Sequence, residues 1–148
     1  MPAITVPALP KSLGYLGLMP FVILAGALWL APSSYQSAVS EALLAYGAVI
    51  LSFMGAIHWG LAIRLETQQE KKILGYSVVP ALMAWLALLI PELYAYSLLL
   101  VAFVVLCVVD SWLTTNYITP TWYPTLRIPL TAVVVASIIL AQVAIVTS

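Results

Sequence analysis

Residues 46–60 read YGAVILSFMGAIHWG, and this stretch decides the fold. It is apolar enough to lie in a bilayer, yet it holds His58, the single histidine of the chain. Small side chains recur along it at spacings of three and four, which places them near one face of a helix. With Trp59 beside them, they are Ala45, Ala48, Ser52, Gly55 and Ala56. Small faces let transmembrane helices approach closely, so the pattern predicts the central helix of a membrane bundle.

The composition points to the same class of protein. Of the 148 residues, 64% are hydrophobic and 7% are charged, whereas soluble domains carry about 25% charged residues. Five basic and five acidic residues give a net charge of zero, which argues against nucleic acid as a partner. The single cysteine, Cys107, excludes a disulfide within the chain and a CxxC-type metal site, and we interpret it as a small apolar core side chain.

Five stretches are long and apolar enough, or nearly so, to cross a membrane, because a span needs about 20 apolar residues. They cover residues 13–31, 43–63, 73–91, 93–114 and 128–147. We therefore expect an all-α integral membrane protein, a bundle of five transmembrane helices that forms a single membrane domain over residues 1–148. The first stretch is expected to stay in the protein as a span and not to be cleaved as a signal peptide.

Helix ends can be predicted from a few local signals. Residues 1–12 are expected to form a short extended tail, with Ser12 as the cap of the first helix. Pro91 and Glu92 allow only a short turn, so the third and fourth helices should be antiparallel neighbours. Pro129 suits the first turn of the fifth helix.

Prolines and glycines also mark expected packing positions. A proline inside a helix leaves the carbonyl one turn earlier without its donor, so kinks are expected at Pro20 and Pro80. Glycines on the 46–60 helix should allow its neighbours to approach. The residues to which we assign helix packing are Gly47, Gly55, Gly60, Pro20 and Pro80.

The distribution of charge predicts the orientation. If the chain crosses five times, one side of the membrane receives every basic residue of the chain. These residues are Lys11, Arg64, Lys71, Lys72 and Arg127. The other side receives Glu41 and Glu92 and no basic residue. Because short cytoplasmic loops are enriched in lysine and arginine, we expect the N-terminus in the cytoplasm and the C-terminus outside.

Two ionisable residues fall inside expected spans. His58 precedes Arg64 by six residues, which corresponds to ~9 Å of helix. Asp110 lies a similar distance before the end of a helix that runs in the same direction, so both side chains should lie at about the same depth. Ionisable groups inside a membrane are costly and usually face the bundle interior, where they find a partner.

Two interpretations of this region remain open. In the functional one, a polar site binds a lipid head group, a quinone or a proton. Its candidate residues are His58, Asp110, Ser52 and Thr131, with Arg64 and Arg127 at the mouth. In the structural one, Asp110 forms an ion pair with Arg127 or Arg64 and His58 hydrogen-bonds a neighbour, which holds the helices together.

Neither a haem nor a catalytic site is expected. The single histidine could supply one axial ligand, with Met54, Met19 or Met83 as the other, and bis-histidine ligation within one chain is impossible. No Ser/His/Asp spacing matches a nucleophile elbow, and the glycines do not form a phosphate-binding loop. We predict no cofactor and no metal.

Four blocks of sequence resemble a known family. They are GYLGLMPF at residues 14–21, the 46–60 stretch, Val79-Pro80 with Trp85, and WYPTLRIPLT at residues 122–131. Together they resemble the uncharacterised membrane family numbered 3429 among domains of unknown function, which has bacterial and mitochondrial members. The resemblance implies a bacterial inner membrane or a mitochondrial inner membrane. It implies no activity, substrate or catalytic residue.

Two functions follow as hypotheses. The first is a non-enzymatic accessory, assembly or interaction subunit that contacts other membrane proteins, because the spans leave little chain for a soluble domain. The alternative is binding or transport of a small ligand (a lipid, a quinone or a proton) at the intramembrane site of His58, Asp110 and the arginines. The second hypothesis requires that these side chains converge beside a cavity.

Overall fold

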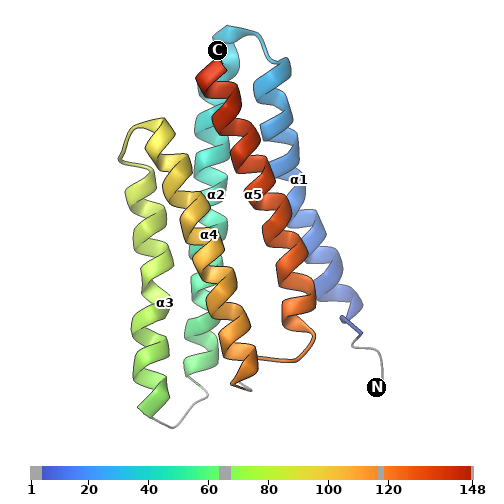
Figure 1. Cartoon of the computed structure of the whole chain (residues 1–148), viewed down its shortest axis with the longest axis vertical. Helices are drawn as coiled ribbons and strands as arrows, with labels where there is room; N and C mark the ends of the chain where they lie inside the picture. The colour runs from blue at the N-terminus through green and yellow to red at the C-terminus, as the bar shows by residue number, and fades with distance from the viewer. Residues whose placement is uncertain (1–4, 64–67, 117–118, 148) are drawn as a thin grey trace.

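The computed structural model describes residues 5–63, 68–116 and 119–147, with no side chains described at 68–70. It contains five helices: α1 (Ala8–Leu30), α2 (Ser33–Ala62), α3 (Gln68–Ala87), α4 (Glu92–Thr115) and α5 (Tyr123–Thr147). The helices run alternately up and down, so that α1 begins at the lower end of the bundle and α5 ends at the upper end (Figure 1). The expected all-α, five-helix architecture is confirmed.

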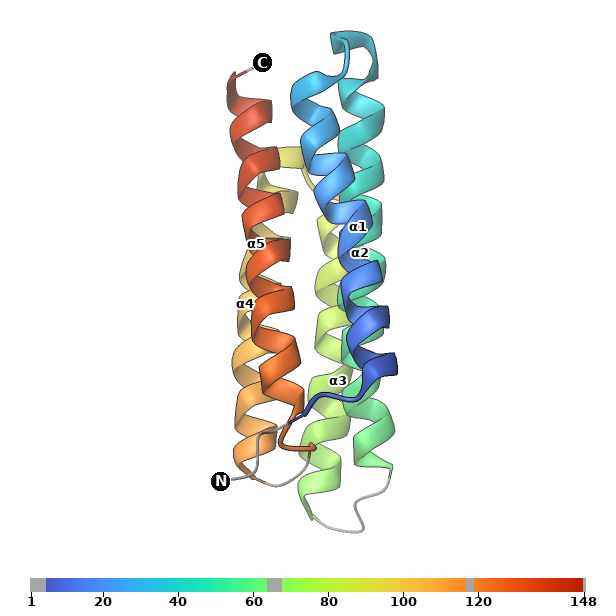
Figure 2. The same cartoon turned by 90° about the vertical axis from the view of Figure 1, so that its right-hand side faces the viewer.

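The helices form two layers. Figure 2 shows α4 and α5 on one side and α1, α2 and α3 on the other. Within this arrangement α2 packs against α1, α3 and α4, while α5 packs against α1 and α4. Residues 46–60 therefore lie in a helix with neighbours on several sides, as the small-residue pattern predicts.

Aromatic side chains hold the centre of the bundle. Phe21 of α1 is buried, and its ring meets Tyr46 of α2 and Phe103 of α4 edge-on, at centroid distances of 5.1 and 5.9 Å. The outer surface is also apolar, with exposed side chains such as Trp29 and Val108. A helical bundle that is apolar inside and outside has the surface expected of a protein that faces lipid.

Four helices, α1, α2, α4 and α5, are long and apolar enough to cross a membrane by length and composition. The same criteria, applied to the described residues, do not select α3. Its first turns carry Lys71 and Lys72, and its apolar part, residues 73–87, is about 22 Å long. That length falls short of the ~30 Å hydrocarbon core of a bilayer.

The N-terminal helix begins earlier than predicted. α1 starts at Ala8, so the extended tail does not continue to Ser12. The Ser12 hydroxyl donates to the Leu9 carbonyl inside the helix and does not cap it. Pro10 is tolerated because the amides of a first helical turn lack intrahelical acceptors. The prediction failed because proline near a helix start was interpreted as a sign of extended chain.

Four other helix ends also differ from the prediction, the first being that of α3, which begins at Gln68 and not at 73. α2 begins at Ser33 and not at 43, so that Glu41 is helical. α3 ends at Ala87, and residues 88–91 make the short turn that keeps α3 and α4 antiparallel. α5 begins at Tyr123, which places Pro129 inside the helix and not in its first turn.

Some small residues of α2 pack against neighbouring helices, and others are exposed on the outside of the bundle. A Cβ atom added to Gly55 would lie 2.7 Å from the Ser77 carbonyl oxygen and 3.1 Å from Pro80 Cβ, so glycine is required for the contact with α3. Gly47 also has close neighbours, with Leu99 Cδ1 at 3.0 Å from such an atom. Gly60 has none within 4 Å and is exposed, so it packs against no described helix of this chain.

Candidate functional site

The Asp110 carboxylate lies at the centre of a buried polar cluster that joins three helices. Its Oδ1 atom lies 2.7 Å from His58 Nε2 of α2, and its Oδ2 atom accepts a hydrogen bond of 2.7 Å from Arg127 Nε of α5. His58, Asp110 and Arg127 are all buried. We call these three residues the triad.

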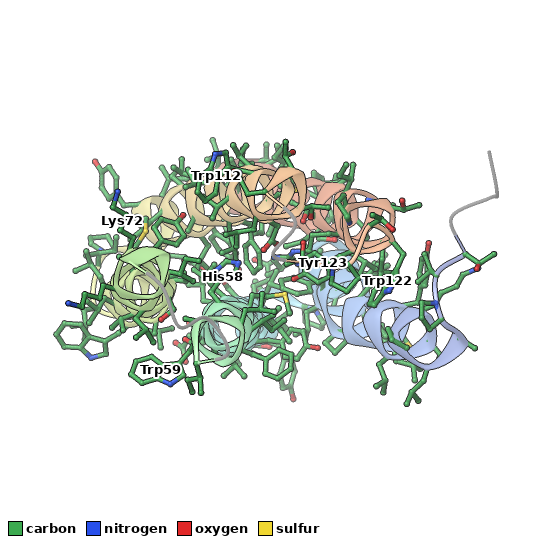
Figure 3. All side chains as sticks on the ribbon, turned by 90° about the horizontal axis from the view of Figure 1, so that it is seen from below. His58, Trp59, Lys72, Trp112, Trp122 and Tyr123 are labelled. Atoms are coloured by element: carbon green, nitrogen blue, oxygen red, sulfur yellow. The ribbon has the colours of Figure 1, made fainter. Side chains whose placement is uncertain are left out.

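The directions of the helices bring the triad together. α2 and α4 both run downward in Figure 1, so residues at equal distances from their lower ends meet at the same depth. Arg127 reaches the same level from the second turn of α5. Seen from below, His58 points between the two layers, whereas its neighbour Trp59 and Trp112 of α4 point outward (Figure 3).

The triad contains charges that burial makes costly. Moving a carboxylate or a guanidinium into a dry interior costs several kcal/mol per ion, which close pairing can offset. Among the described residues each oxygen of Asp110 has one partner, and the Asp110 and Arg127 charges cancel. The ion pair of the structural interpretation is therefore present, and three of the candidate side chains of the functional interpretation converge.

Three buried polar atoms close to this level have no hydrogen-bond partner among the described residues. They are His58 Nδ1, Arg127 Nη2 and Thr131 Oγ1. Buried polar groups are nearly always paired with protein, water or a ligand. The unpaired guanidinium nitrogen is the most informative, because a guanidinium has only donors and is always charged.

Arg127 also forms part of the wall of a cavity of about 390 Å³ between α1, α2 and α5. Small-molecule sites typically measure about 300–1,000 Å³ and are mostly apolar, with a few polar groups. The lining residues are Leu9, Pro10, Leu13, Gly14, Gly17, Leu18, Phe21, Ile50, Phe53, Met54, Ile57, Phe103, Trp122, Tyr123, Leu126, Arg127, Leu130 and Val134. Arg127 is the one charged side chain in this set.

The remaining candidate residues lie apart from the triad. Ser52 donates to the Ala48 carbonyl of its own helix at 2.8 Å. Thr131 is buried one turn beyond Arg127, with no described contact to His58 or Asp110. Arg64 lies outside the described residues. Within the part of the chain that is described, no group of three or more His, Cys, Asp and Glu residues is arranged to hold a metal ion.

The ligand hypothesis required a cavity, but sequence reasoning did not identify the residues that line it. Its walls include Gly17 and Phe21 from one family-like block, and Trp122 and Tyr123 from another. The signal in the sequence was the set of separate blocks at 14–21, 46–60 and 122–131. In the structure all three blocks contribute to the lining. Without the tertiary structure, nothing shows that they face one another.

A second polar cluster at the opposite end of the bundle was also missed. Ser40 of α2 hydrogen-bonds the Glu92 carboxylate, and its hydroxyl lies 2.9 Å from the hydroxyl of the fully buried Tyr96. This cluster joins α2 to α4. It went unnoticed because Ser40 was expected to lie in a loop.

Comparison with known proteins places these observations in a family. The family described as protein of unknown function (DUF3429) matches residues 6–143. Transmembrane protein 69 of Xenopus tropicalis is 39% identical over 131 residues, which cover 86% of this chain and 51% of that protein. The chain thus spans about half the length of this curated relative. No solved structure matches the chain. The chain belongs to the DUF3429 family and is a multi-pass helical membrane protein.

Proposed function

We propose that this protein binds a small amphipathic molecule within the membrane, in the cavity between α1, α2 and α5. One observation carries the proposal: the Nη2 atom of Arg127 is buried without a described partner, and Arg127 forms part of the wall of a 390 Å³ cavity that is otherwise mostly apolar. The molecule would place a polar group at Arg127 and its apolar part against the surrounding side chains.

A purely structural role explains less of the geometry. An ion pair that only joins α4 to α5 requires the 2.7 Å contact between Arg127 and Asp110, and nothing more. A structural ion pair gives no reason for the cavity beside Arg127. It also gives no reason for Arg127 Nη2 to be without a partner among the described residues. Ligand binding accounts for both features, while the triad still holds the three helices together.

The orientation stays as predicted from the basic residues. The beginnings of α1, α3 and α5 lie at the lower end of the bundle (Figure 1), which we propose as the cytoplasmic face because these segments carry Lys11, Lys71, Lys72 and Arg127. We also propose that α3 crosses as a short fifth span. Its support is that α4 runs parallel to α2, so the chain must return along the bundle between them.

An accessory or assembly subunit is the second candidate. Its support is the outer face of α2, where Ala45, Ala56 and Gly60 are exposed. Small side chains in this position let another transmembrane helix approach closely. In this case the protein would act through a partner in an inner membrane, and the cavity could remain a secondary feature.

Native mass spectrometry of the protein, extracted gently from its own membrane, separates the two functions. Ligand binding predicts one chain with a defined small-molecule mass. Reproducible association with other subunits and no such mass would favour the accessory function.

A variant pair then tests the cavity itself. Gly17 lines the cavity, and a Cβ atom there meets nothing within 4 Å, so Gly17→Leu should place its side chain in the cavity. Gly26→Leu is the matched control, because Gly26 lies on the same helix, has equally open surroundings and does not line the cavity. The bound mass should disappear in Gly17→Leu and persist in Gly26→Leu. Equal retention in both variants would exclude this cavity as the site.

A further inference from the structure

We infer that the ligand is a single-chain amphipath with an anionic head group, a carboxylate or a phosphate, bound at the Arg127 guanidinium. This inference rests on the proposed function and specifies its ligand class. Separate features of the cavity indicate the type of head group, the position of the head group and the number of hydrocarbon chains in the ligand.

The donors of Arg127 determine the type of head group. A guanidinium has five N–H donors and no acceptor, so whatever pairs with Nη2 must accept hydrogen bonds. Nη2 itself is buried, so an acceptor would reach the guanidinium from the part of Arg127 that lines the cavity, since the side chain is 7% exposed. Carboxylate and phosphate oxygens match the planar guanidinium best, and charge-assisted hydrogen bonds are about twice as strong as neutral ones.

The cavity begins beside two helix N-termini and an exposed lysine, which favour anions. α1 and α5 both begin here, and residues of their first turns, Leu9 and Tyr123, line the cavity. Helix N-termini carry a partial positive charge and favour anions. Lys11 is exposed beside them, and among the described residues no acidic side chain lines the cavity. These charges disfavour a cationic head group and favour an anionic one over a neutral one.

The shape of the cavity determines the rest of the ligand. Along α5 the lining extends from Tyr123 to Val134, which is about 16 Å of helix. Beyond Arg127 the wall is apolar, with Phe21 and Phe103 at the bundle centre. A volume of about 390 Å³ lies near the lower limit for small-molecule sites, which favours a ligand with one hydrocarbon chain over one with two. The head would lie near the basic end and the tail near the bilayer centre.

Photo-crosslinking with three matched probes tests this inference. The probes are a long-chain fatty acid, the monoalkyl phosphate and the fatty alcohol of the same chain, each with a diazirine near the end of the tail. The protein is held in phosphatidylcholine nanodiscs, and labelled peptides are mapped by mass spectrometry. At least one anionic probe should label α1 and α5 peptides about tenfold more than the alcohol, because hydrogen bonds between charged groups are stronger than those to a neutral hydroxyl. The anionic probe that labels more strongly, the fatty acid or the monoalkyl phosphate, shows whether the site prefers a carboxylate or a phosphate.

Variants then assign the selectivity to Arg127. Arg127→Gln should abolish the preference for anionic probes, and Arg127→Lys should retain part of it. Lys72→Gln is the matched control, because Lys72 is an exposed cation on α3 at the same end of the bundle, on the side opposite Tyr123 and Trp122 (Figure 3). Gly17→Leu leaves Arg127 in place and should block all labelling, which keeps the test decisive if Arg127→Gln does not fold.

The outcomes separate this inference from the proposed function. Equal labelling by the alcohol and by both anionic probes at the same peptides would overturn the anionic head group and leave ligand binding intact. Equal loss in Lys72→Gln and Arg127→Gln would also overturn it, since general surface charge would then explain the preference. Absence of labelling by every probe, together with no bound mass in native spectra, would overturn both proposals.

Discussion

Arg127 donates its Nε–H to Asp110 at 2.7 Å while its Nη2 atom stays buried without a described partner. The Arg127 side chain therefore joins α5 to α4 through Asp110 and also lines a mostly apolar cavity. Because Asp110 also contacts His58, a single carboxylate connects α2, α4 and α5. The stability of the bundle and its proposed binding activity depend on the same residues, so mutations must be chosen to separate them.

Asp110→Asn should destabilise the protein strongly. The substitution leaves the Arg127 charge buried without its counter-ion, and breaking a buried pair in this way costs about 3–5 kcal/mol. Thermal unfolding in mild detergent would show a lower midpoint, and less folded protein would be recovered from membranes. Glu41→Gln is the control, because Glu41 is an exposed carboxylate near the other end of the bundle. An unchanged midpoint for Asp110→Asn would exclude a structural role for Asp110.

Replacing the whole triad extends this prediction. His58→Leu, Asp110→Leu and Arg127→Leu in one chain remove both charges and the imidazole together. Full replacement of a buried ionic network by apolar groups is often neutral or stabilising. We expect the triple variant to regain most of the stability that Asp110→Asn loses, and to lose selectivity for anionic probes. A triple variant less stable than Asp110→Asn would show that the triad stabilises the fold beyond charge compensation.

Gly55→Ala should weaken the contact between α2 and α3. The added methyl group would lie 2.7 Å from the Ser77 carbonyl oxygen, so the two helix backbones must separate. Overpacking of this kind typically costs about 1–3 kcal/mol. Gly60→Ala is the matched control on the same helix, with no neighbour within 4 Å, and should be neutral or slightly stabilising. Equal midpoints of thermal unfolding for the two variants would contradict the close approach at Gly55.

The topology can be tested at the turn between α3 and α4. Leu89 is 62% exposed in that turn, so Leu89→Cys in a Cys107→Ser background should react with a membrane-impermeant maleimide. If α3 crosses the membrane and the N-terminus is cytoplasmic, intact cells should be labelled from outside. A C-terminal alkaline phosphatase fusion should be active for the same reason. Labelling only after permeabilisation, together with an inactive fusion, would contradict the proposed orientation.

Much of the architecture could be predicted because it depends on local composition. Long apolar runs interrupted by Pro91 and by the polar segment near Lys71 were enough to predict five helices. Helix ends were less predictable, as Ser12 and Pro129 show, because proline is compatible both with a helix start and with its interruption. The depth of His58 and Asp110 was predictable from the constant rise per residue of parallel helices.

The sequence by itself determined the class of protein, the number of helices and the two ionisable residues that had to find partners inside the bundle. Only the tertiary structure decided that Arg127 pairs with Asp110, that Ser52 stays with its own helix, and that a cavity borders the triad. The physical reason is that hydropathy and helical period define what each helix contains. The rotation and spacing of helices packed side by side then determine which side chains meet and where space remains.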